Sequence, residues 1–173
     1  EADKIRLYVM DLTTGEKNDF SEGFDQNAEG LKWGDDNTIW FISDWHATDE
    51  IYSLDIPTGR ITKHTDGVHN YTSVIPTGKM LLATKVSMSK PAEIYKVDPA
   101  TGKDEELSFV NKPILDQLTM GKVEKRWIKT TDNKDMLVWM IYPPHFDPNR
   151  KYPAILYCEG GPQSTVSQFW SYR

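Results

Sequence analysis

The chain has 173 residues, a net charge of −6 and a hydrophobic fraction of 38%. This length allows one domain or two small ones with a buried core. The negative charge argues against a nucleic-acid surface, because phosphate binding needs clustered Lys and Arg. No apolar run of about 18 residues is present, so no membrane span is predicted. The single cysteine, Cys158, excludes an intramolecular disulfide and argues against a cysteine-based metal site.

Three segments in the first two thirds of the chain share the pattern Y-x-x-D-x-x-T-G. They are spaced by 44 and 43 residues, at Tyr8–Gly15, Tyr52–Gly59 and Tyr95–Gly102. Apolar residues alternate in each segment, as they do in a strand with one packed face. The aspartate then stands where its carboxylate can accept bonds from the turn, and glycine can take a positive φ. Each segment predicts a hairpin with a structural aspartate, with return strands at Lys17–Phe20, Arg60–His64 and Lys103–Leu107.

A second hairpin is predicted between successive repeats. LKWGDDNTIWFIS has strands around a Gly34–Asn37 turn, and TSVIPTGKMLLAT has strands around Pro76–Lys79. Two hairpins in each unit make four strands in about 43 residues, the size of a β-propeller blade, whereas kelch blades of about 50 residues fit less well. Two full blades and part of a third are expected between Ile5 and Leu107. That is an incomplete propeller, since a closed one has about four to eight blades.

The composition changes after the last repeat. Asn111–Lys122 shows no strand alternation and predicts a linker with a helical turn, followed by two strands around Asp132–Asp135. Ala154–Cys158 is all apolar, which predicts a strand covered on both faces, with Cys158 as a buried thiol. We predict a partial propeller over residues 1–113, and over 114–173 the linker and first strands of a second domain. The pattern at both ends of the chain favours a fragment of a longer protein.

The order of these elements resembles the prolyl oligopeptidase family of serine peptidases, which join a β-propeller to an α/β-hydrolase domain. The resemblance is carried by the blade repeats, and then by Trp127–Tyr142, Pro143–Pro144, Lys151–Pro153 and Gly160–Ser164. GGPQS is most similar to the acylaminoacyl-peptidase and dipeptidyl-peptidase-5-like branch. It implies a mainly β fold, with the last propeller blades followed by the first α/β-hydrolase strands. It also implies a peptide substrate, no cofactor, and a periplasmic or secreted location.

The resemblance also implies that the glycine turn helps to form an oxyanion hole. Gly161 is expected to offer a backbone N–H to the oxygen that gains charge, with Gly160 supporting the turn, because a side chain would block the approach. Related members carry His or Tyr where this chain has Glu159. A carboxylate donates no hydrogen bond unless it is protonated, so Glu159 favours a backbone donor.

The rest of the catalytic machinery is absent from the sequence. No G-x-S-x-G nucleophile elbow occurs, and in this fold the triad follows the order Ser, Asp, His. All three residues are expected beyond Arg173, and this chain alone is expected to be inactive. Two alternatives stay open: an esterase or other acyl hydrolase on the same scaffold, and a non-catalytic propeller that binds a protein or polysaccharide. Residues 114–158 count against the second, because a plain propeller does not need them.

Other polar and aromatic residues are assigned structural roles. The Asp35–Asn37 cluster is explained by its hairpin turn, and the four histidines lack metal-ligand spacing. The tryptophans Trp33, Trp40 and Trp45 are expected in blade packing. The loop at Asp44–His46 could face a substrate chamber. Unpaired blade faces and strand edges predict self-association of the isolated chain.

Overall fold

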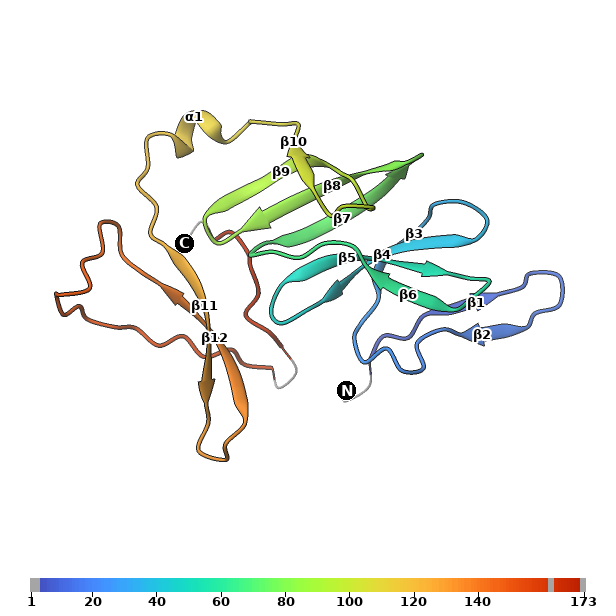
Figure 1. Cartoon of the computed structure of the whole chain (residues 1–173), viewed down its shortest axis with the longest axis horizontal. Helices are drawn as coiled ribbons and strands as arrows, with labels where there is room; N and C mark the ends of the chain where they lie inside the picture. The colour runs from blue at the N-terminus through green and yellow to red at the C-terminus, as the bar shows by residue number, and fades with distance from the viewer. Residues whose placement is uncertain (1–3, 162–163, 172–173) are drawn as a thin grey trace.

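The computed structural model describes residues 4–161 and 164–171, and its regular structure is almost entirely β-strand (Figure 1). The one helix of the described residues, α1 (Lys112–Leu115), is short. The strands in chain order are β1 (Tyr8–Met10), β2 (Lys17–Asp19), β3 (Glu29–Trp33), β4 (Thr38–Asp44), β5 (Asp49–Asp55), β6 (Arg60–Lys63), β7 (Asn70–Thr77), β8 (Met80–Ser87), β9 (Lys90–Val97), β10 (Asp104–Glu106), β11 (Val123–Lys129) and β12 (Asp135–Ile141).

The first ten strands form two four-stranded antiparallel blades and one extra hairpin. β3–β6 pair in chain order as blade A, and β7–β10 pair in chain order as blade B. A single parallel pair, Asp49 with Asn70, links the two blades. The β1–β2 hairpin is a separate two-stranded sheet. These strands lie within the region from Ile5 to Leu107, where the repeat predicts two blades and part of a third.

The three repeat turns have nearly the same geometry. Their glycines have φ values of 75°, 68° and 69°, a region where a Cβ atom is strained. Each glycine N–H donates to the carbonyl of the repeat aspartate at 2.8 Å, in the pairs Gly15–Asp11, Gly59–Asp55 and Gly102–Asp98. Each aspartate carboxylate also accepts a backbone N–H from the turn, from Thr13, Thr58 and Ala100. The structural interpretation of these aspartates is confirmed.

The central strands of blade A, β4 and β5, contribute residues to two cores, because alternate residues of a strand point to opposite sides. Ile39 and Phe41 of β4 join one core cluster, while Trp40 and Ile42 pack against the other. The first cluster lies toward the β1–β2 hairpin and consists of Leu7, Ala28, Ile39, Phe41, Tyr52 and Leu54. The second lies toward blade B and consists of Ile51, Tyr71, Val74, Leu81, Ala83, Tyr95 and Val97.

A buried carboxylate fastens the segment that leaves each blade. The Thr65 hydroxyl donates to Glu50 at 2.6 Å and accepts the Ile51 N–H at 2.9 Å. Blade B repeats the arrangement, with Ser108 donating to Glu93 and accepting the Ile94 N–H. In both blades the hydroxyl lies 15 residues after the glutamate. E-I-Y followed by Ser or Thr, 15 residues after the glutamate, is therefore a second repeat signal that was missed from the sequence.

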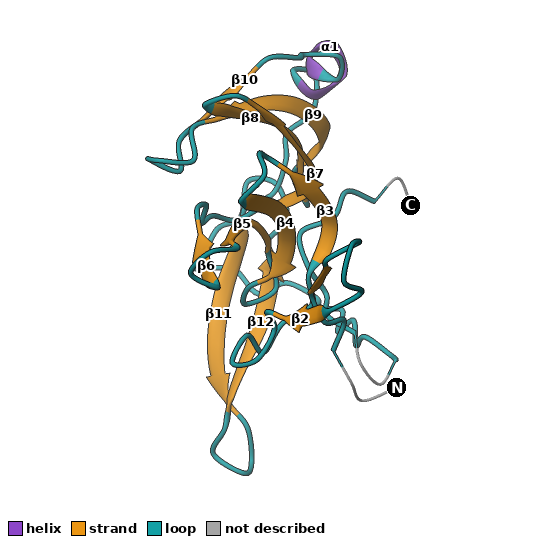
Figure 2. Ribbon diagram, turned by 90° about the vertical axis from the view of Figure 1, so that its right-hand side faces the viewer, coloured by secondary structure: helices purple, strands orange, loops and turns teal. Residues whose placement is uncertain are grey.

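The β11–β12 hairpin is a sheet of its own, beside the blades in Figure 1 and below β8–β10 in Figure 2. It is predicted correctly, and its strands pair in register from Val123 with Ile141 to Lys129 with Asp135. The linker before it contains α1, as expected. No helix of the described residues is long and apolar enough to cross a membrane.

The predicted strand at Ala154–Cys158 is wrong for this structure. Residues 151–160 have no regular secondary structure, and the side chain of Ile155 is 98% exposed. Cys158 is exposed rather than buried. A strand needs the N–H and C=O groups of a neighbouring strand, and no segment of the described residues pairs with this one. An apolar run by itself therefore did not produce a strand.

The tryptophan prediction is only partly correct. Trp40 packs against the core between the blades, as expected. Trp33 is 58% exposed, because every residue of β3 is exposed at the end of the strand path. The prediction that Trp33 packs within a blade is therefore wrong.

The repeat glycines provide a matched test of backbone strain. Gly15→Ala puts a Cβ at φ 75° with no atom within 4 Å, whereas at Gly102 (φ 69°) the Cβ lies 2.5 Å from the His64 carbonyl oxygen. We expect Gly15→Ala to lower the free energy of unfolding by about 1–2 kcal/mol, and Gly102→Ala to lower it by about 1–3 kcal/mol more. Urea denaturation of the chain measures both, and equal losses would contradict the close approach to His64.

Thr65→Ala tests the hydrogen bond from the Thr65 hydroxyl to the buried Glu50 carboxylate, which we call the clasp. The buried Glu50 carboxylate loses a donor, so we expect a loss of about 1–3 kcal/mol in the free energy of unfolding. Thr77→Ala is the matched control, because the Thr77 hydroxyl donates to the Met80 carbonyl in an exposed turn. Its expected effect is within about 0.5 kcal/mol. Similar losses from the two substitutions in denaturant titrations would rule out a special role for the clasp.

Candidate functional site

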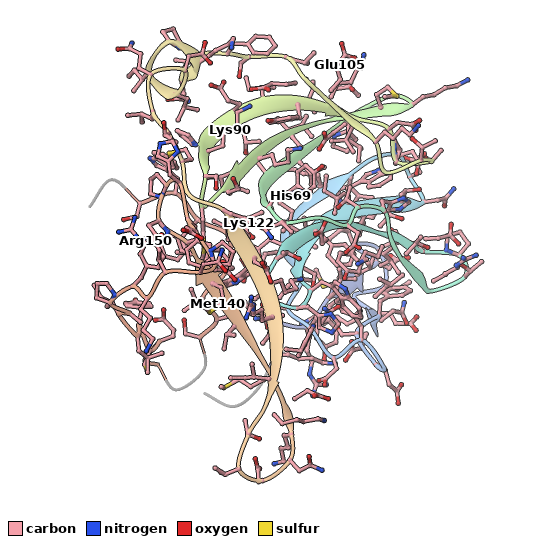
Figure 3. The ribbon with its side chains drawn as sticks, turned by 60° about the vertical axis from the view of Figure 1, so that its left-hand side comes forward. His69, Lys90, Glu105, Lys122, Met140 and Arg150 are labelled. Atoms are coloured by element: carbon pink, nitrogen blue, oxygen red, sulfur yellow. The ribbon has the colours of Figure 1, made fainter. Side chains whose placement is uncertain are left out.

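Later parts of the chain contact one end of the blades. β4, β6 and β8 end there, so the loops at residues 45–48, 64–69 and 88–89 gather at this place, which we call the docking end. The His46 ring lies 5.2 Å from the Trp127 ring of β11, and Asn70 and Met88 bond to Ser167 and Gln168. Figure 3 views this region from the hairpin side, with His69 and Lys122 labelled.

The loop that joins β4 to β5 packs against the β11–β12 hairpin. His46 and Ala47 have φ values of 50° and 60°, as the two central residues of a tight hairpin turn require. The turn is closed by backbone bonds in both directions between Trp45 and Thr48. The Trp45 ring lies against the His46 ring. The Lys63 ammonium nitrogen lies over the Trp45 ring, 4.6 Å from the ring centroid. This loop was considered for a substrate chamber, and the structure shows His46 edge-on to Trp127.

A carboxylate pair closes the end of the β4–β5 hairpin. Asp44 and Asp49 are directly opposed in register, and a hydrogen bond joins their side chains. Burial, the bond to Asp44 and the nearby charges of Asp44, Glu29 and Glu50 raise the pKa of Asp49 to about 7. Asp49 is therefore the carboxyl group that can hold a proton close to neutral pH.

The pair borders a cavity of about 300 Å³ between the inner strands of the two blades. The cavity is lined by Asn27, Glu29, Gly30, Ile42, Ser43, Asp44, Asp49, Tyr71 and Thr72. Over residues 4–161 and 164–171, no group of three His, Cys, Asp or Glu side chains could hold a metal ion. A second cavity of about 370 Å³ lies at the far end of blade A, beside the turn at Trp33–Asp36, and is remote from the docking end.

Asn70 connects the carboxylate pair to the last described segment. Its Nδ2 donates to the Asp49 carboxylate and, at 2.9 Å, to the Ser167 hydroxyl. Its Oδ1 accepts the N–H groups of Asp49 at 3.2 Å and Gln168 at 3.1 Å. The side chain is thus bonded on both its donor and its acceptor side. The sequence did not predict that Asp49 and Asn70 meet. The one signal it offers is that each is the first residue of a strand that follows a blade loop.

The predicted oxyanion residues lie in the segment without regular structure. Gly160 is exposed, its φ is outside the positive region, and a Cβ built on it meets no atom within 4 Å. Glu159 is also exposed and accepts a hydrogen bond from the Tyr157 hydroxyl at 3.3 Å. Gly161 is the last described residue before a gap at 162–163. The assignment of Gly160 and Gly161 to an oxyanion loop stays a prediction.

The same arrangement of strands occurs in proteins of known structure. No family model matches the chain. The chain is 43% identical over 174 residues to dipeptidyl-peptidase 5 of Porphyromonas gingivalis, a match that covers 100% of the chain and 25% of that protein. Its fold superimposes on Pyrococcus horikoshii acylaminoacyl peptidase with a TM-score of 0.78, over 98% of the chain and 26% of that structure, at 21% identity. The chain corresponds to a segment of the prolyl oligopeptidase family.

The match to dipeptidyl-peptidase 5 spans both parts of the chain, the blades and the residues that follow them. The β-propeller domain of the Pyrococcus furiosus trilobed protease superimposes on 64% of the chain with a TM-score of 0.52, at 18% identity. The chain spans about a quarter of the length of the curated relatives that it matches. The predicted family is confirmed. The mainly β fold class is also confirmed, with propeller blades followed by the β11–β12 hairpin.

Asp49→Asn tests the raised pKa in the carboxylate pair. Because the folded pKa of about 7 exceeds the ordinary value of 3.8, the folded state binds the proton more tightly, and stability falls as pH rises from about 4 to 7. Asparagine imitates the protonated form. We expect it to raise the free energy of unfolding at pH 8 by about 1–2 kcal/mol, allowing for solvent screening, with the gain shrinking toward pH 4.

Asp98→Asn is the control with the opposite sign. The backbone N–H of Ala100 and other donors of the turn lower the pKa of Asp98, so its charged form is stabilising. We expect this substitution to destabilise the chain at pH 8, by an amount that shrinks as pH falls through the acidic range. Thermal unfolding at a series of pH values measures both variants. A pH-independent effect of Asp49→Asn would contradict the raised pKa of Asp49.

Proposed function

We propose that this chain is part of a serine peptidase that cleaves peptides through an acyl-enzyme, with the Ser, Asp and His of the triad supplied by residues beyond Arg173. The observation that carries the proposal is the 43% identity to a dipeptidyl-peptidase over the whole chain. Hydrolysis then proceeds by attack of an activated serine on the peptide carbonyl, followed by attack of water on the ester. No G-x-S-x-G elbow occurs in the 173 residues, which supports a nucleophile from elsewhere.

The geometry supports a site at the docking end. The segment that carries the Gly160–Gly161 turn returns to the blades at Ser167 and Gln168, beside the cavity bordered by Asp44 and Asp49. A substrate bound there would lie between the blades and the second domain. Blades over the active site would limit the size of the peptides that enter.

The turn would contribute one hydrogen-bond donor to the oxyanion hole. We assign this role to the backbone N–H of Gly161, with Gly160 supporting the turn. A glycine carries no side chain that would block the approach, so its backbone N–H can come close to a substrate oxygen. The Glu159 carboxylate is acceptor-only when ionised and is left outside this role.

The proposal is tested with the full-length protein that contains this chain. Three substrates are compared: a dipeptidyl nitroanilide with a free amine, its N-acylated form, and a nitrophenyl ester. We expect cleavage of the free-amine dipeptide, abolished by a serine-directed inhibitor, and no cleavage by the 173-residue chain alone. Cleavage of the ester alone would favour the acyl hydrolase, and cleavage of none would leave a binding module as the better account.

A variant pair tests the oxyanion assignment in the same enzyme. Gly161→Pro removes the N–H, and we expect kcat to fall by about 10²–10³-fold. Glu159→Gln is the matched control, because this exposed side chain has no part in the proposed donor. It should keep kcat within about threefold of the parent value. Equal losses from the two substitutions would contradict a donor at Gly161.

A further inference from the structure

The chain after the glycine turn is held in place without any β-ladder. No residue of 151–161 or 164–171 belongs to a helix or a strand. Ordering such a segment costs about 1–2 kcal/mol of backbone entropy per residue, which tertiary contacts must offset. Three consecutive residues of the segment, 166–168, make hydrogen bonds of this kind.

Each of these three residues is bonded to an element far away in the chain. The Val166 carbonyl accepts the Trp139 Nε1–H of β12 at 2.9 Å. The Ser167 hydroxyl accepts the Asn70 amide at 2.9 Å, and the Gln168 N–H donates to the Asn70 Oδ1 at 3.1 Å. The bonds to Asn70 span 97 and 98 residues. The Asn70 side chain, which belongs to blade B, therefore makes two of these bonds.

The blade side of this contact is buried and oriented in advance. Asn70 is 4% exposed and Gln168 is 1% exposed. The Asp49 carboxylate accepts from the Asn70 Nδ2, while the Asp49 N–H donates to the Oδ1, so only one orientation of the amide suits this neighbour. In that orientation the amide also matches the Ser167 hydroxyl and the Gln168 N–H. The Met88 N–H adds a bond to the Gln168 Oε1 at 3.1 Å.

We propose that Asn70 is a positioning residue, whose carboxamide clamps Ser167 and Gln168 to blade B and thereby fixes the path of the chain that follows the Gly160–Gly161 turn. It touches no reacting atom and acts through the segment it holds. The proposal rests on the proposed function, since it makes a blade residue necessary for the geometry of the oxyanion loop. A misplacement of about 1 Å in a catalytic group can cost up to about 10²-fold in rate.

Asn70→Ala in the full-length protein tests the clamp by two readouts. The first is amide hydrogen exchange, in which we expect peptides covering 164–171 to lose about tenfold or more of their protection while β8 and β9 keep theirs. The second is steady-state kinetics with the free-amine dipeptide, in which we expect kcat to fall by about 10–100-fold and KM to change by less than about threefold.

Two further variants separate positioning from general destabilisation. Ser167→Ala removes one partner of Asn70 while leaving blade B unchanged, and combined with Asn70→Ala it should show a non-additive loss of kcat. Asn111→Ala is the matched control, because this amide bonds to Ala92 and Glu93 and not to the clamped segment. It should leave both the hydrogen exchange of residues 164–171 and kcat unchanged.

The possible outcomes distinguish the two proposals. Unchanged exchange at 164–171 in Asn70→Ala would overturn the clamp. Lost protection with an unchanged kcat would overturn the positioning role. Equal effects of Asn111→Ala would show general destabilisation and also overturn it. If the parent protein cleaves no peptide, the proposed function fails and the positioning role fails with it, while the exchange experiment still decides whether Asn70 holds the segment.

Discussion

Burial of the central strands of blade A, β4 and β5, on both faces is the constraint on which the rest of the structure depends. Alternate residues of β4 point to opposite cores, Phe41 toward the first hairpin and Trp40 toward blade B. Strands covered on both sides cannot slip by one residue without exchanging the two cores. The blades are therefore stacked in one register. Their loops consequently end at the same level and form a single surface that the rest of the chain can contact.

That surface shows how polar contacts can replace a β-ladder. The hairpin β11–β12 reaches the blades through aromatic rings, His46 against Trp127. The last described segment reaches them through hydrogen bonds to Asn70 and the Met88 N–H. Buried polar groups are stabilising only when they are paired. The pairing of Asp49 with Asn70 therefore joins the blade interior to a segment that has no secondary structure of its own.

Patterns confined to about ten residues were predictable, and long-range ones were not. The repeat turns were found because Asp55 and Gly59 act on each other within one turn. The clasp of Glu50 by Thr65 was missed, although its residues recur in blade B, because its partners lie on different strands. The apolar run at Ala154–Cys158 was assigned to a strand, but apolar composition supplies no hydrogen-bonding neighbour. The family resemblance was carried by the order of elements and is confirmed by the comparison.

The sequence by itself determined the local structure, namely the hairpins and the glycines at positive φ, and also the family. These depend on backbone sterics, alternation and short-range bonds, which neighbouring residues set directly. Only the tertiary structure decided which residues meet at the docking end, the raised pKa of Asp49 and the contacts of Asn70. Those properties depend on burial and on partners up to 98 residues away. No local pattern encodes them, because they arise when separate elements pack together.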